Sequence, residues 1–176
     1  AMFAVSGRLD AKRFGPGVDT HLTPFMSGRG RPGRSGPLDG AGRRSVYLQL
    51  RRNFVNPFFS AFDKPNPVST RGRRSESNVP AQALSLLNDD FVIGQATVWA
   101  KRALASATNE DARIDAMFVD ALGRAPSDDE RKRCSAFLAE VYESGAKAPR
   151  TKSRSVAAWS ELAHVLFNLK EFAWIR

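Results

Sequence analysis

Arginine directly follows glycine at seven positions of this chain, and these pairs are the residues best suited to chemistry. Glycine lets the backbone turn so that N–H groups face one side, and the planar guanidinium of arginine fits a carboxylate, a sulfate or a phosphate. Two arginine pairs also bracket the stretch SVYLQL. The candidate anion-binding residues are Arg29, Arg31, Arg34, Arg43, Arg44, Arg51, Arg52, Arg73 and Arg74.

The sequence leaves three interpretations of these arginines open. They could bind an external polyanion such as a polysaccharide. They could bind single-stranded nucleic acid through nearby aromatic residues, which we rank lowest because no nucleic-acid-binding motif is present. They could instead pair internally with backbone carbonyls and with Asp10, Asp19, Asp39 and Asp63. We favour the internal role, because a long irregular segment leaves many carbonyls that need donors.

The stretch between the two arginine pairs alternates apolar and polar residues over positions 45–50, which predicts a short half-buried strand. Successive side chains of a strand point to opposite faces. We therefore expect one arginine of each pair, Arg43-Arg44 and Arg51-Arg52, to turn inward and the other outward. The inward arginines would be structural, and the outward ones would form any polyanion site.

Candidates for catalysis or metal binding are few. His21 follows Asp19 and could act as a base with it, but we interpret it as a loop histidine that hydrogen-bonds the backbone. His164 lies one helical turn after Glu161, which indicates a surface pair. Cys134 lies on an apolar helix face, where a thiol is expected to be buried and inert. No haem-attachment, Walker, dinucleotide-binding or zinc-cluster motif occurs, so we expect no metal and no cofactor in this chain.

Charge divides the chain into two halves. Residues 1–78 hold 14 Lys and Arg against 5 Asp and Glu, a net charge of +9, whereas residues 79–176 hold 13 against 13. The basic half favours an anionic partner or a neighbouring acidic surface. The one cysteine excludes an internal disulfide, and no apolar run reaches the ~20 residues that span a membrane.

The expected fold is mainly α. Residues 79–176 predict a small helical bundle, and residues 1–78 predict an irregular Gly/Pro/Arg-rich part with one or two short strands. Pro80 is expected in the first turn of a helix that begins at Asn78 or Val79, and SDDE at 127–130 predicts a capping box. The predicted helical stripes are Val79, Ala83, Leu86 and Leu87; Val92, Ala96, Trp99 and Ala103; Ile114, Met117, Phe118, Ala121 and Leu122; Cys134, Phe137, Leu138, Val141 and Tyr142; and Trp159, Leu162, Leu166 and Leu169 toward Trp174.

The start of the chain reads as the end of a helix. Met2, Phe3 and Val5 are apolar, and Gly7 can stop the helix. We therefore expect residues 1–176 to be a single domain that is the C-terminal fragment of a larger one. The apolar side chains at its start should be exposed or packed only at an edge.

Several long stretches carry a family resemblance: AVSGRLD, HLTPFMSGRGRPGRSGPLDGAGRRSVYLQLRRNF, RGRRSESNVPAQALSLLND and WSELAHVLFNLKEF. Together they resemble the C-terminal part of the planctomycete-specific domain of unknown function 1553, over nearly the whole chain. The resemblance implies a large parent protein with an export signal, hence an extracytoplasmic location, and with cytochrome domains that carry haem elsewhere. It also implies the missing N-terminal part of the domain as a partner, and it assigns no catalytic residue.

The sequence thus favours a non-catalytic structural or binding module of a large extracytoplasmic multidomain protein, with polyanionic polysaccharide as the candidate ligand. Part of an uncharacterised enzyme or of a redox-associated protein is the alternative. Nucleic-acid binding is the third hypothesis.

Overall fold

The computed structural model describes residues 1–65, 70, 72–73, 80–144 and 152–173. The chain forms two compact units: a helical unit of residues 1–8 and 86–176, and a loop unit of residues 9–85. The loop unit holds 13 Lys and Arg against 5 Asp and Glu, a net charge of +8, and the helical unit holds 14 against 13, a net charge of +1. The excess positive charge therefore belongs to the loop unit. The expected single domain over residues 1–176 stays a prediction.

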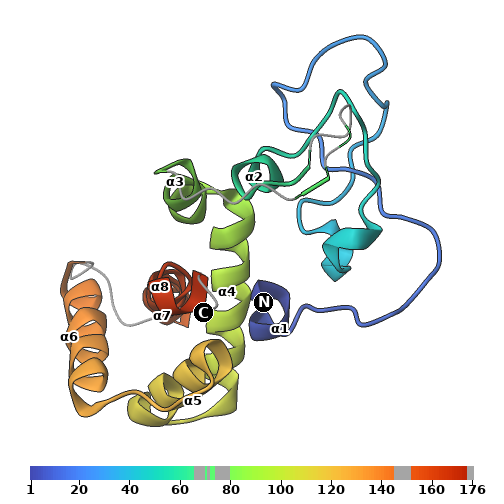
Figure 1. The fold of residues 1–176 in the computed structure, drawn as a ribbon. Helices are drawn as coiled ribbons and strands as arrows, with labels where there is room; N and C mark the ends of the chain where they lie inside the picture. Colours follow the sequence, from blue (N-terminus) through green and yellow to red (C-terminus); the bar gives the residue numbers. More distant parts are fainter. Residues whose placement is uncertain (66–69, 71, 74–79, 145–151, 174–176) are drawn as a thin grey trace. The chain divides into compact units, whose positions relative to one another are not determined.

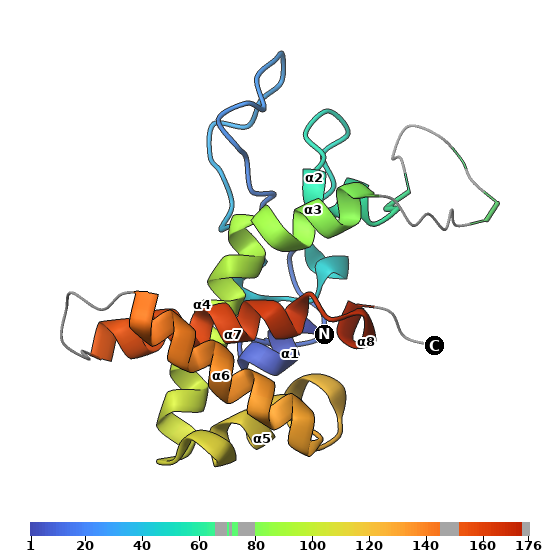
Figure 2. The same cartoon turned by 90° about the vertical axis from the view of Figure 1, so that its left-hand side faces the viewer.

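The helical unit confirms the predicted mainly α fold. Helix α7 packs most extensively against α4 and crosses it at a steep angle, and α6 packs on α7 (Figures 1 and 2). Helix α5 contacts α4, α6 and α7. The helices are α1 (Met2–Ser6), α4 (Asp90–Ser106), α5 (Glu110–Leu122), α6 (Asp128–Ser144), α7 (Lys152–Phe167) and α8 (Lys170–Ala173).

The core of this unit follows the apolar periodicity of the sequence. All four predicted residues of the α4 stripe are buried, and the indole of Trp99 stacks on Phe167 of α7 with ring centroids 5.0 Å apart. Residues spaced by three and four positions share one face of a helix, so each stripe meets its neighbour as a continuous apolar surface. The buried members of the predicted stripes are Val92, Ala96, Trp99, Ala103, Ile114, Met117, Phe118, Cys134, Leu138, Trp159, Leu162 and Leu166.

Side chains at the helix starts satisfy free backbone N–H groups. The Asp89 carboxylate accepts from the Phe91 N–H at 2.9 Å and caps α4. The predicted capping box is confirmed: the Ser127 N–H donates to Glu130 at 2.7 Å, and the Glu130 N–H donates to the Ser127 hydroxyl at 3.3 Å. The boundaries of α4 and α6 are thus specified locally.

The apolar residues at the chain start were expected to be exposed or packed only at an edge; helix α1 corrects this for Val5, which is buried, whereas Met2 and Phe3 are half-buried. Its contacts are with α4: Val5 is 7% exposed, and the Phe3 ring meets Phe91 edge-on at 5.3 Å. The buried Ser6 hydroxyl donates to the side-chain amide oxygen, Oε1, of Gln95 at 2.7 Å. Gly7 ends the helix with φ 76, as predicted. Helix α4 thus buries Val5 and covers Met2 and Phe3 in part.

Two other helical predictions are wrong in part. Helix α3 (Pro80–Asn88) was expected to bury Ala83, Leu86 and Leu87, but Leu87 is 50% exposed and Ala83 is exposed, while Gln82 and Leu86 are buried. Packing has overridden hydrophobicity at these positions. The last helix is interrupted between α7 and α8, where the Leu169 N–H donates to Leu166, three residues back, and tightens the turn. Predictions at Asn78, Val79, Arg74 and Trp174 lie outside the described residues, as does Gly145, where the sequence predicts a helix end.

The loop unit has short turns where a strand was predicted. Residues 45–50 do not form a strand: η2 (Ser45–Tyr47) is a single 3₁₀ turn, and Val46 is 76% exposed. Only isolated parallel bridges, Asp10 with Arg43 and Val18 with Leu48, occur in the described part of this unit. Alternation in the sequence failed because no neighbouring segment of sufficient length pairs with this one. The other elements are η1 (Gly40–Gly42) and the short helix α2 (Pro57–Ala61).

Arg124, between α5 and α6, joins several parts of the helical unit. Its guanidinium donates two hydrogen bonds of 2.8 Å to Glu130 and two of 2.8 Å to Glu171 of α8. It also lies 5.7 Å from the ring centroid of Phe118. Hydrogen bonds from Arg124 lower the pKa of Glu130 to about 2 and also lower the pKa of Glu171. One cation therefore connects α5, α6 and α8.

We expect this network to make stability depend on acid pH. Both carboxyl groups have a folded-state pKa below the ordinary value of 4.5, so their contribution is present above that pH and is lost as pH falls toward about 2. Arg124→Gln should lower the free energy of unfolding at neutral pH and flatten its decline below pH 4.5. Urea denaturation across this range measures both effects. Arg133→Gln, an exposed change on α6, is the charge-matched control; equal declines in the two variants would contradict the assignment.

Cys134 is buried, as the sequence predicts. Burial raises the pKa of its thiol, and the nearby Glu130 charge raises it further. Because only the thiolate reacts quickly, a disulfide reagent should label the native protein far more slowly than the urea-unfolded chain. Absorbance of the released thiol measures both rates. Similar rates in the two states would show that the thiol is accessible.

Candidate functional site

Arg43 is the buried member of the arginine set. It is 8% exposed, and its Nη2 donates to the Phe14 carbonyl at 3.0 Å. Its Nε lies 3.6 Å from the Asp10 carboxylate, an ion pair too long to be a hydrogen bond, and its guanidinium lies 4.2 Å from the ring centroid of Tyr47. The predicted internal role, with Asp10 and a backbone carbonyl as partners, is therefore confirmed for Arg43.

Residues 19–36 form a closed loop with a short base. The Gly36 N–H donates to the Thr20 carbonyl at 3.0 Å, and the Leu22 N–H donates to the Ser35 hydroxyl at 2.9 Å. A Cβ at Gly36 would lie 1.8 Å from the Asp19 carbonyl oxygen, so only glycine permits this approach. We call residues 19–36 the closed loop. Loops with joined ends that carry their own internal contacts frequently have functional roles.

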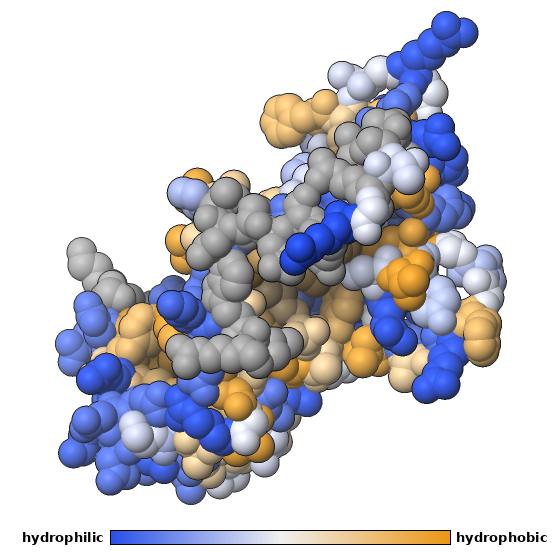
Figure 3. All heavy atoms as spheres, in the orientation of Figure 1, coloured by the Kyte–Doolittle hydropathy of each residue, from blue (hydrophilic) through white to orange (hydrophobic). Residues whose placement is uncertain are grey.

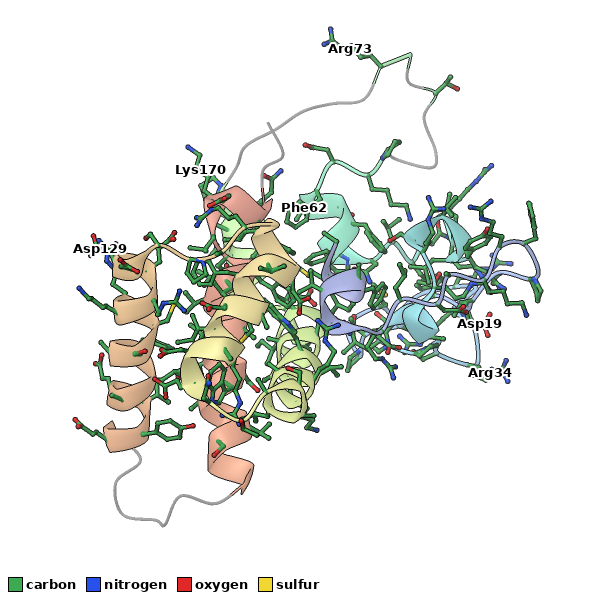
Figure 4. The ribbon with its side chains drawn as sticks, turned by 90° about the horizontal axis from the view of Figure 1, so that it is seen from below. Asp19, Arg34, Phe62, Arg73, Asp129 and Lys170 are labelled. Carbon is green, nitrogen blue, oxygen red and sulfur yellow. The ribbon has the colours of Figure 1, made fainter. Side chains whose placement is uncertain are left out.

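Two arginines of the closed loop bond within it. Arg34 Nη2 lies 3.3 Å from the Asp19 carboxylate at the base, and Figure 4 shows the two side chains together. Arg31 Nη1 donates to the backbone carbonyls of Thr23 and Met26 and so spans the tip. These contacts also match the predicted internal role, although the Arg34 side chain stays 87% exposed. Arg34 can therefore still meet an external anion.

Other arginines of the loop unit face solvent. Arg29, Arg44 and Arg52 are exposed, and none of them forms an ion pair with another residue that the structure describes. Arg73 is exposed too, but Figure 4 places it far from Arg34, so these two cannot share one small site. On the face of the loop unit seen in Figure 3, hydrophilic side chains surround separate hydrophobic ones. The arrangement fits an extended surface better than a single cavity.

The expected inward and outward split holds for one arginine pair and fails for the other. Arg43 is buried and Arg44 is exposed, as predicted. Arg51 and Arg52 are both exposed, and Arg51 Nη2 donates to the side-chain carbonyl of Gln49 at 3.1 Å. The prediction is wrong at the second pair because Arg52 lies in a turn closed by the Phe54 N–H and the Arg51 carbonyl at 3.1 Å. A turn does not alternate its side chains between two faces.

The loop unit contains a small pocket in which several polar lining side chains already make hydrogen bonds. Its volume is about 20 Å³, which is room for a water molecule rather than a substrate. Its lining includes Thr20, Asn56 and Lys64. The Thr20 hydroxyl donates to the Gln49 carbonyl, and the Asn56 side chain accepts from the Phe58 N–H. Burial lowers the pKa of Lys64, which lies 5.0 Å from the Phe59 ring centroid. The pocket therefore lies where several loop segments pack against one another.

The histidines have structural partners. His21 Nδ1 lies 3.1 Å from the Gly36 carbonyl, so the interpretation as a loop histidine bonded to the backbone is confirmed. His164 was expected to pair with Glu161, but its Nε2 donates to the Leu86 carbonyl at 2.9 Å, which corrects that prediction. Among the described residues, no group of three or more His, Cys, Asp or Glu side chains could hold a metal ion, and no helix is long and apolar enough to cross a membrane.

Sequence reasoning missed two features of the closed loop. Phe25 is 93% exposed, more than any other large apolar residue in the described part of the chain. Gly36 was not distinguished from the other glycines, although its backbone approaches Asp19 most closely. The flanking signal TPFM, a proline before a phenylalanine in a polar segment, could have indicated a turn that presents an aromatic ring.

Comparison with known proteins gives one match. The family described as PSD1, protein of unknown function (DUF1553), matches residues 1–138. No curated protein and no solved structure matches the chain. The matched segment contains the whole loop unit and helices α1 to α5, together with most of α6.

Arg43 and Arg44 offer a matched test of the structural and exposed roles. Arg43→Ala should lower the free energy of unfolding by about 1–3 kcal/mol, because it leaves the Phe14 carbonyl without its donor and removes an ion pair. Arg44→Ala should change stability by no more than about 0.5 kcal/mol, as is usual for exposed positions. Urea denaturation of both variants checks this difference. Equal losses would remove the distinction between buried and exposed arginines.

Proposed function

We propose that this chain, which belongs to the DUF1553 family (PSD1), is a non-catalytic binding module whose loop unit holds a polyanionic polysaccharide. The observation that carries the proposal is the set of solvent-facing arginines Arg29, Arg44 and Arg52, which have no acidic partner among the described residues. Guanidinium groups in that state bind sulfates and carboxylates by charge and by paired hydrogen bonds.

Some arginines of the loop unit make internal contacts while others are exposed, and this difference supports a binding role. Arg43 and Arg31 are engaged with the chain's own carbonyls, so the loops that carry the remaining arginines are held in place. A preorganised surface loses less conformational entropy when a ligand binds. The loop unit's net charge of +8 would also draw an anionic polymer toward it.

The candidate catalytic groups of the loop unit are engaged in structural contacts, which supports binding over catalysis. His21 is bonded to the Gly36 carbonyl, and Asp19, its nearest candidate partner in sequence, pairs with Arg34. A catalytic base needs an oriented partner and space for a substrate. The described pocket lined by Thr20, Asn56 and Lys64 has room for about a water molecule.

The wider setting of the proposal comes from the family resemblance of the sequence. We propose an extracytoplasmic multidomain parent in which another domain carries haem and in which further residues complete this domain. A polysaccharide is a fitting ligand for such a location, because sulfated and uronic polymers occur outside the cytoplasm. Nucleic acid is the competing polyanion, and the experiment below separates the two.

Retention on immobilised heparin and on immobilised single-stranded DNA, each eluted with a salt gradient, tests the proposal. The chain should elute from heparin at higher salt than from DNA. Stronger retention on DNA would favour the nucleic-acid hypothesis, and elution from both columns at low salt would leave the arginines with structural roles only.

A charge-matched pair of variants locates the binding surface. Arg44→Gln with Arg52→Gln should lower the salt needed for elution from heparin, and the slope of log K against log salt should fall by about 0.7–0.9 for each arginine that no longer neutralises an anionic group. Lys132→Gln with Arg133→Gln removes the same charge from the exposed surface of α6 and should change elution little. Equal effects of the two double variants would indicate attraction by net charge alone.

A further inference from the structure

The tip of the closed loop presents an aromatic ring to solvent. Phe25 is 93% exposed, whereas Leu22 is 6% exposed and Met26 is half-buried. A large apolar side chain held this far into solvent loses the favourable free energy of burial, about 1.5–3 kcal/mol for such a residue. A ligand that covers the ring would recover part of it.

The backbone that carries this ring is fixed by the loop's own contacts. The Met26 N–H donates to the Thr23 carbonyl at 3.1 Å, which closes a turn around Phe25. Arg31 reaches across the tip and donates to the carbonyls of Thr23 and Met26. At the other end, the Thr20 and Gly36 backbones join the base at 3.0 Å. The ring thus stands on a platform that is formed before any ligand arrives.

The same loop also carries exposed cations. Arg29 is exposed, and the Arg34 side chain is 87% exposed while it pairs with Asp19 at 3.3 Å. The ligand that complements this tip therefore carries anionic groups together with an apolar face. Charge alone does not account for Phe25, and the apolar ring alone does not account for the arginines.

We propose that Phe25 stacks on the C–H face of one sugar ring of a polysaccharide while Arg29 and Arg34 bind sulfate or carboxylate groups elsewhere along the same polymer. This inference rests on the proposed polyanion-binding function and assigns to Phe25 the contact with the sugar ring. Bases of single-stranded nucleic acid also stack on aromatic side chains, so poly(dT) is the competing ligand in the test below. A bilayer is a weaker fit, since one aromatic side chain buries less apolar surface than an acyl chain that by itself anchors only marginally.

A comparison of heparin, which has sugar rings, with inorganic polyphosphate, which has none, separates the contribution of stacking to affinity from that of charge. Phe25→Ala should lower the affinity for heparin about five- to tenfold, which is the lower range for loss of one aromatic stacking contact. The same variant should bind inorganic polyphosphate as tightly as the unaltered chain, because that polymer has no ring. Phe25→Trp should restore heparin binding. Isothermal titration or biolayer interferometry at fixed salt gives these affinities.

A matched control lies in the same unit. Phe14 is 78% exposed, and its backbone carbonyl rather than its ring meets Arg43, so Phe14→Ala removes an exposed ring and leaves the loop tip intact. It should leave heparin affinity unchanged. Circular dichroism of each variant verifies that the change at an exposed position has not altered the fold.

Several outcomes would overturn the assignment. Unchanged heparin affinity in Phe25→Ala, or an equal loss on heparin and polyphosphate, would show that the ring does not read the sugar. A larger loss on poly(dT), or a loss confined to phosphatidylserine vesicles, would assign the tip to nucleic acid or to a membrane surface. If the unaltered chain binds neither heparin nor polyphosphate at low salt, the proposed function itself fails, which is distinct from a ring that makes no difference.

Discussion

Backbone carbonyls that have no partner in a sheet or helix need other hydrogen-bond donors, and this constraint governs the loop unit. Where a sheet would have ladders, the described part of this unit has isolated bridges, so side chains supply part of what regular structure usually supplies. Arg43 donates to Phe14 and pairs with Asp10, and Arg31 donates to two carbonyls of the closed loop. A guanidinium suits this task because it offers five donors in one plane. Arg31 and Arg43 thus hold the loops that carry the solvent-facing arginines Arg29 and Arg44.

The helical unit could be predicted well because its information is local. The stripe through Val92, Ala96 and Trp99 is buried as expected, and Asp89 caps the helix that carries it. Failures occurred where a distant partner decides the outcome. Helix α3 buries Gln82 and exposes Leu87, and no spacing within nine residues shows which side will be covered.

The candidate site was predicted in composition but only partly in geometry. Glycine and arginine content indicated anion chemistry, and the internal role was correct for Arg43 because carbonyls and acids were abundant around it. Residues 45–50 alternate like a strand, yet they turn at Ser45–Tyr47 since the neighbouring chain pairs with them only at Val18. The prediction that one of Arg51 and Arg52 turns inward depended on that strand, and both side chains are exposed.

The base of the closed loop has an implication for how this surface can vary. Asp19 and Gly36 approach so closely that a methyl group on Gly36 would collide with the Asp19 carbonyl. The segment between them is held by its own contacts, those of Arg31 with the Thr23 and Met26 carbonyls. The entropic cost of closing a loop grows only slowly with its length. Insertions, deletions or an entire replacement tip could therefore be grafted between these two anchors without repacking the rest, so that ligand preference can diversify on an unchanged scaffold.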